Sequence, residues 1–117
     1  MNSTQLIDYC LSKPGTEQST ENRWQANQIK VAGVMFAMLR DIEGHPVIAL
    51  KAGQQAAEQL RQQHPEIVPC DCLNKAHWNS VQLEGNLPDS HVYSLIDSSY
   101  QQVVAGLSEE QRQAITG

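Results

Sequence analysis

The chain has 117 residues, the size of one ordinary domain, and 40% of them are hydrophobic while 18% are charged. Eight basic against thirteen acidic residues give a net charge of −5, which disfavours nucleic acid and anionic membranes unless a local basic patch offsets it. Residues 31–39, the longest apolar run, are far short of the roughly 20 that cross a bilayer, and residues 1–5 lack signal-peptide character. We therefore expect a single cytoplasmic domain over residues 1–117, with no membrane partner.

The first half of the chain predicts a helix followed by strands. Apolar side chains recur at helical spacing in residues 6–11, and Lys-Pro-Gly then ends that helix. Residues 17–24 are polar and are interpreted as an exposed edge strand. Three further strands are predicted over 28–31, 34–41 and 47–51, and the short, turn-like connections between them require antiparallel neighbours.

The second half predicts two long elements around one strand. Residues 54–63 carry an apolar stripe typical of a helix, which Pro65 ends. Residues 77–83 alternate as a strand whose Val81 side faces the core. The clearest helix begins near residue 89 and ends at Gly106.

A short last helix is also expected, because Ser108 and Gln111 have the spacing of a capping box. The whole order is helix, three or four strands, helix, one or two strands, helix. It predicts an α+β fold class, a two-layer domain in which helices pack against an antiparallel sheet.

Several short motifs in this order resemble the MmcQ/YjbR-like family of small bacterial proteins. The residues that carry the resemblance are Leu6–Cys10, Lys13–Gly15, Lys30–Val31, Met35–Met38, Leu50–Lys51, Leu73–Trp78, Leu87–Asp89 and Ser98–Gln102. The resemblance implies a fold similar to CyaY/frataxin and to secretion chaperones. It also implies a DNA-binding function, the label that members commonly carry, and supplies no catalytic residue.

The candidate binding site is centred on Trp78, with Lys75 and His77 beside it in the sequence. The other candidates are Lys51, Trp24 and Lys30. An indole beside ammonium groups suits single-stranded nucleic acid, because stacking contributes about 1–3 kcal/mol per base. It equally suits a peptide groove, since aromatic residues lead among interface hot spots. The alternative is that Trp78 packs beneath a loop and that the strand cations are merely solvated.

The remaining polar motifs do not indicate chemistry. Cys10, Cys70 and Cys72 are interpreted as reduced thiols, since Cys-x-Cys without a second pair is not a zinc pattern. No nucleophile elbow, phosphate loop or metalloprotease motif occurs in the sequence. We expect a monomeric protein that is not an enzyme and needs no metal or cofactor. Its expected partner is DNA, or alternatively a protein segment that it receives as an adaptor.

Overall fold

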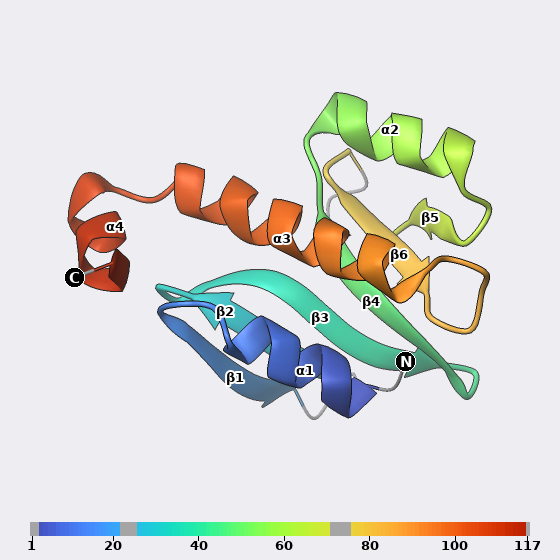
Figure 1. Cartoon of the computed structure of the whole chain (residues 1–117), viewed down its shortest axis with the longest axis horizontal. Helices are drawn as coiled ribbons and strands as arrows, with labels where there is room; N and C mark the ends of the chain where they lie inside the picture. The colour runs from blue at the N-terminus through green and yellow to red at the C-terminus, as the bar shows by residue number, and fades with distance from the viewer. Residues whose placement is uncertain (1–2, 22–25, 71–75, 117) are drawn as a thin grey trace.

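The computed structural model describes residues 3–21, 26–70 and 76–116, which fold as helices packed against one antiparallel sheet (Figure 1). The elements in chain order are α1 (Ser3–Leu11), β1 (Thr16–Glu21), β2 (Ala26–Val31), β3 (Val34–Ile42), β4 (His45–Lys51), α2 (Gln54–Gln63), β5 (Ile67–Pro69), β6 (Trp78–Gln82), α3 (Asp89–Ala105) and α4 (Glu109–Thr116). The predicted α+β class and element order are confirmed. The short strand β5 was not predicted from the sequence.

The six strands are ordered β1-β2-β3-β4-β6-β5, and each neighbouring pair is antiparallel. The turn between β2 and β3 has φ of 52° at Ala32 and 79° at Gly33, and the next turn has 53° at Glu43 and 83° at Gly44. Positive φ at both central residues is the geometry of type I′ turns, whose twist matches that of the paired strands. The two glycines therefore fix the tight hairpins, and β1 is an edge strand as predicted.

The main core lies between the sheet and the helices α1, α2 and α3 (Figure 1). The strands contribute alternate residues, such as Ile29 in β2 and Ile48 in β4, because successive side chains point to opposite faces. In α3 the core residues follow the helical period, and the Tyr100 ring meets Phe36 edge-on with 5.3 Å between centroids. Val81 of β6 is buried in this core, which confirms the predicted orientation of that strand.

A serine on α3 joins two strands where their ladder ends. The register of β3 against β4 runs to the pair Ala37 and Leu50, so the next pair would be Phe36 and Lys51. Instead the Lys51 N–H donates to Ser99 Oγ (2.8 Å), and Ser99 Oγ–H donates to the Phe36 carbonyl (2.5 Å). Ser99 is fully buried, so its hydroxyl takes the place of a ladder hydrogen bond and ties α3 to the sheet.

The last helix begins with the expected capping box. The Gln111 N–H donates to Ser108 Oγ (3.1 Å), and the Ser108 N–H donates to Gln111 Oε1 (3.0 Å). None of the helices in the described part of the chain is both long and apolar enough to cross a membrane.

Candidate functional site

Four of the six predicted binding residues lie in the described part of the chain. Trp24 and Lys75 lie outside the described residues. Lys30 lies in β2, Lys51 ends β4 and Trp78 begins β6. His77 comes just before β6, where its carbonyl accepts a hydrogen bond from the Ala52 N–H at 2.7 Å.

Strand register brings Lys30, Lys51 and Trp78 to one face of the sheet, opposite the main core. Lys51 pairs directly with Trp78, and Lys30 pairs with Met35. Directly paired residues of antiparallel strands share a face. We call this side the outer face; its described members on β2, β3, β4 and β6 include Gln28, Lys30, Met35, Met38, Arg40, Val47, Ala49, Lys51, Trp78, Ser80 and Gln82.

Trp78 lies at the margin of a small apolar cluster on the outer face. The buried members of this cluster are Ala26, Met38, Ala49 and Cys70, and Met35 and Trp78 pack against them while half-buried. The indole is therefore not sealed in the main core, although part of it is engaged in packing. Its remaining surface is available beside the Lys51 position.

Charge is divided between the two layers of the molecule. Every lysine and arginine in the described strands, namely Lys30, Arg40 and Lys51, belongs to the outer face. The helices carry six carboxylates and two cations: Asp8, Glu58, Asp89, Asp97, Glu109 and Glu110 against Arg61 and Arg112. Glu17 of the edge strand pairs with Lys30 and is the carboxylate that register places on the outer face opposite a cation. The outer face therefore carries all the cations of the described strands, together with the carboxylates of Glu17 and, at the β3–β4 hairpin end, of Glu43 and Glu84.

A hollow lies at one end of the outer face, and the sequence did not predict it. It has a volume of about 600 Å³ and lies between the β3–β4 hairpin and strands β5 and β6. Ile42 and Val68 line it and expose 41% and 37% of their surface, so its wall is partly apolar. At its rim His45 Nδ1 lies 3.0 Å from Glu84 Oε1. The hollow depends on β5, which has only three residues and no alternating pattern to reveal it.

Away from the outer face, the three titratable side chains of Tyr9, Lys13 and Asp97 form a structural clamp. Asp97 on α3 accepts hydrogen bonds from the Tyr9 hydroxyl (2.7 Å) and the Lys13 ammonium (2.5 Å), joining α1 to α3. Burial alone would raise the pKa of Asp97, but these two hydrogen bonds outweigh it and lower the pKa. The bond to Asp97, followed by burial, raises the pKa of Tyr9 to about 12. These three side chains therefore link α1 and the segment after it to α3.

The described residues, 3–21, 26–70 and 76–116, form neither a metal site nor a reactive-thiol site. No three histidine, cysteine or carboxylate side chains gather there in a way that could hold a metal ion. Cys10 and Cys70 are both fully buried, whereas Cys72 lies outside the described residues. Burial raises the pKa of Cys10 to about 12, so this thiol keeps its proton near neutral pH.

The architecture, an antiparallel sheet with helices gathered on one side, belongs to the two-layer α+β class. The YjbR family model matches residues 11–102, and the chain belongs to the YjbR family, as its motifs predicted. The uncharacterized protein YjbR of Escherichia coli (strain K12) is 50% identical over 115 residues, which cover 98% of each chain.

Two solved structures share the fold. A Deinococcus radiodurans protein with a DUF419 domain aligns with a TM-score of 0.86 and 27% identity, over 97% of this chain and 86% of the other. A Pseudomonas syringae protein aligns with a TM-score of 0.78 and 29% identity, over 87% of this chain and 98% of the other. The comparisons establish family and fold, so the activity has to be argued from the surface of the chain itself.

Proposed function

We propose that this protein is a non-enzymatic binding module whose outer face holds single-stranded nucleic acid. In this proposal Trp78 stacks on a base while Lys30 and Lys51 contact phosphates. The observation that carries it is the placement of all the described strand cations on the same face as the half-buried indole. An anionic strand is attracted to this face and repelled by the acidic helix layer, so the fold itself orients the partner.

The spacing of the strands sets the size of the contact. Neighbouring strands lie roughly 4.8 Å apart, so the three strand steps from Trp78 on β6 to Lys30 on β2 span about 14 Å. Lys51 lies between them on β4. A short stretch of nucleic acid crossing the sheet can therefore reach all three side chains, and few phosphates are engaged.

The absence of an assembled reaction centre in the described residues supports a binding role. Tyr9, Lys13 and Asp97 are committed to each other, and burial holds Cys10 as a thiol. An activated nucleophile usually has a lowered pKa, whereas the pKa values of the Tyr9 hydroxyl and the Cys10 thiol are raised.

Fluorescence anisotropy of a labelled oligothymidylate, measured from low salt to about 0.15 M, tests the proposal. The logarithm of the affinity should fall against the logarithm of salt by about 0.7 for each phosphate contacted. Lys30→Gln and Lys51→Gln should each reduce that slope by about 0.7, because each removes one phosphate contact. Arg112→Gln on α4 is the matched control, since it removes a cation away from the outer face.

Trp78→Ala should weaken binding by about 1–3 kcal/mol, the contribution of one stacked base. Trp78→Phe should recover part of it because a stacking ring is restored. Failure to bind at low salt, or an equal loss in Arg112→Gln, would refute a nucleic-acid site on the outer face.

The hollow beside β5 favours a second candidate, an extended segment of a partner protein. Its exposed Ile42 and Val68 could receive apolar side chains, as in a peptide groove. A partner captured from lysate should then survive nuclease treatment. Val68→Glu should abolish capture of this partner, whereas Lys30→Gln should leave it unchanged. The nucleic-acid proposal predicts the opposite pattern for these two variants.

A further inference from the structure

The hollow at the β3–β4 hairpin end of the outer face combines an apolar lining with carboxylates. Its apolar lining residues come from β3, β4 and β5 and are Ile42, Pro46, Val47, Val68 and Pro69. Glu43 and Glu84 add two carboxylates, and no lysine or arginine is among the described lining residues. Exposed apolar surface that is rimmed by polar groups is typical of an interaction site.

The charge of the hollow differs from that of the rest of the outer face. Arg40 pairs with Val47 in register, but it does not line the hollow. Lys51 lies at the far end of β4, a strand of seven residues, so about 20 Å of strand separates it from His45 at the rim. The Glu84 side chain is 57% exposed and therefore accessible to a partner. The carboxylates at this end repel phosphate and favour a lysine or arginine side chain.

The edge of the sheet limits how a partner can dock. β5 is the last strand of the described sheet, but it has only three residues, and Pro69 has no N–H to donate to an added strand. A partner therefore binds through side chains that enter the hollow. Ile42 and Val68 lie on strands three steps apart, a span of about 14 Å that an extended segment of about five residues covers.

We propose that the hollow docks an extended segment of a partner protein in which alternate apolar side chains have a lysine or arginine beside them. The apolar side chains cover Ile42 and Val68, and the cation faces the carboxylates of Glu43 and Glu84. The inference rests on the second candidate function, that of an adaptor, and names the chemistry of the segment it receives. It is independent of the nucleic-acid site.

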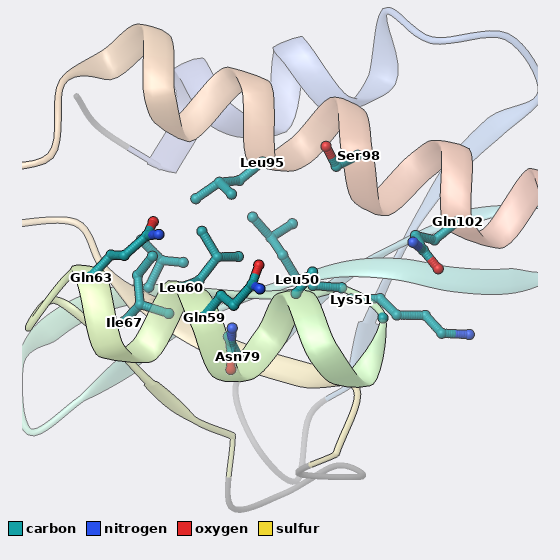
Figure 2. A pocket seen from close by; sticks show the side chains of 14 residues that line it. Leu50, Lys51, Gln59, Leu60, Gln63, Ile67, Asn79, Leu95, Ser98 and Gln102 are labelled. Carbon is teal, nitrogen blue, oxygen red and sulfur yellow. The ribbon is translucent and has the colours of Figure 1, made fainter.

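A capped peptide of sequence Lys-Ser-Val-Ser-Val-Ser-Lys is a suitable probe. When the peptide is extended, its valines and lysines share one side, and a lysine at each end serves either chain direction. Titration into protein with labelled methyl groups at low salt, followed by NMR, should give saturable shifts at Ile42, Val47 and Val68. Leu60 and Leu95 line a separate cavity between α2 and α3, where Figure 2 shows them, and their signals should not move.

Two matched peptides separate the contribution of charge from that of apolar contact. Replacing both lysines with glutamate should abolish binding, because the carboxylates of the hollow then face like charges. Replacing both valines with serine should weaken binding by at least about tenfold, because two apolar side chains no longer leave water. Both comparisons use the unsubstituted protein, so neither depends on the folding of a variant.

Two variants of the protein locate the site. Val68→Ser should weaken binding of the lysine–valine peptide by about threefold to tenfold, since it removes apolar surface from one wall. Val34→Ser is the matched control, because Val34 is 43% exposed at the opposite end of β3 from Ile42. Glu84→Gln should weaken binding by up to about fivefold, the contribution of one exposed ion pair, whereas Glu58→Gln on α2 should leave it unchanged.

The proposal is overturned if the lysine–valine peptide gives no saturable shift at Ile42 and Val68, or if the glutamate peptide binds equally well. An equal loss in Val68→Ser and Val34→Ser would also overturn it. A nuclease-resistant partner that Val68→Glu loses, in a protein that does not bind the lysine–valine peptide, would retain the adaptor function and refute the segment chemistry assigned here.

Discussion

Replacing Ser99 with alanine removes the hydroxyl that stands between two strands and leaves two backbone groups without their partner. The Lys51 N–H loses its acceptor and the Phe36 carbonyl loses its donor, at a residue that is fully buried. Each buried backbone group left unpaired costs about 1–3 kcal/mol. Some closure of β3 onto β4 could recover one bond, so we expect Ser99→Ala to lower the free energy of unfolding by about 2–4 kcal/mol.

Urea unfolding followed by circular dichroism measures this difference directly. Ser98→Ala is the matched control, because Ser98 is exposed on the same helix turn and should change stability by less than about 0.5 kcal/mol. A Ser99→Ala protein within that same margin of the unsubstituted chain would refute the bridging role of the hydroxyl.

Three further predictions concern the clamp, a thiol and a turn. The pKa of Asp97 is lowered on folding, so the stability advantage over Asp97→Asn is present above the ordinary pKa of 3.8 and should vanish as the pH falls through the lowered value. In the same variant, ultraviolet titration should show the pKa of Tyr9 falling from about 12 toward 10. Cys10 should resist thiol reagents at neutral pH until the protein is unfolded, which mass spectrometry of labelled peptides can check. Gly15→Ala should destabilise the protein more than Gly33→Ala, as measured by urea unfolding. Both glycines have positive φ, so both substitutions strain the backbone. A methyl group at Gly15 would in addition lie 2.8 Å from a side-chain carbon of Ile115 in α4, whereas a methyl group at Gly33 would enter open space. Equal losses in the two variants would contradict the close approach.

The parts of the fold that the sequence predicted are those in which local pattern and packing agree. The helical period placed Ser99 in the buried stripe of α3, and the alternation of β6 placed Val81 in the core. The hydroxyl bridge of Ser99 was not predictable, because it depends on where the β3–β4 register ends. Strand β5 was not predicted, because Ile67–Pro69 is too short to show an alternating pattern.

The candidate site was predictable in composition but not in arrangement. Sequence alone nominated Trp78, Lys51 and Lys30, yet their common face follows from the pairing of strands that are distant in the chain. The hollow beside β5 was missed altogether. Its wall residues Ile42 and Val68 are far apart in the chain, and only the strand order β3-β4-β6-β5 brings them to the same end of the outer face.

The two methionines of the outer face offer the most direct test of where a partner binds. Met35 and Met38 both belong to the apolar cluster that Trp78 borders, whereas the helix layer can be monitored at Ile96. Titration of an unlabelled oligothymidylate into protein with labelled methyl groups should move the Met35 and Met38 signals and leave that of Ile96 in place. Unmoved methionine signals under conditions where binding is saturated would contradict the assignment of this face.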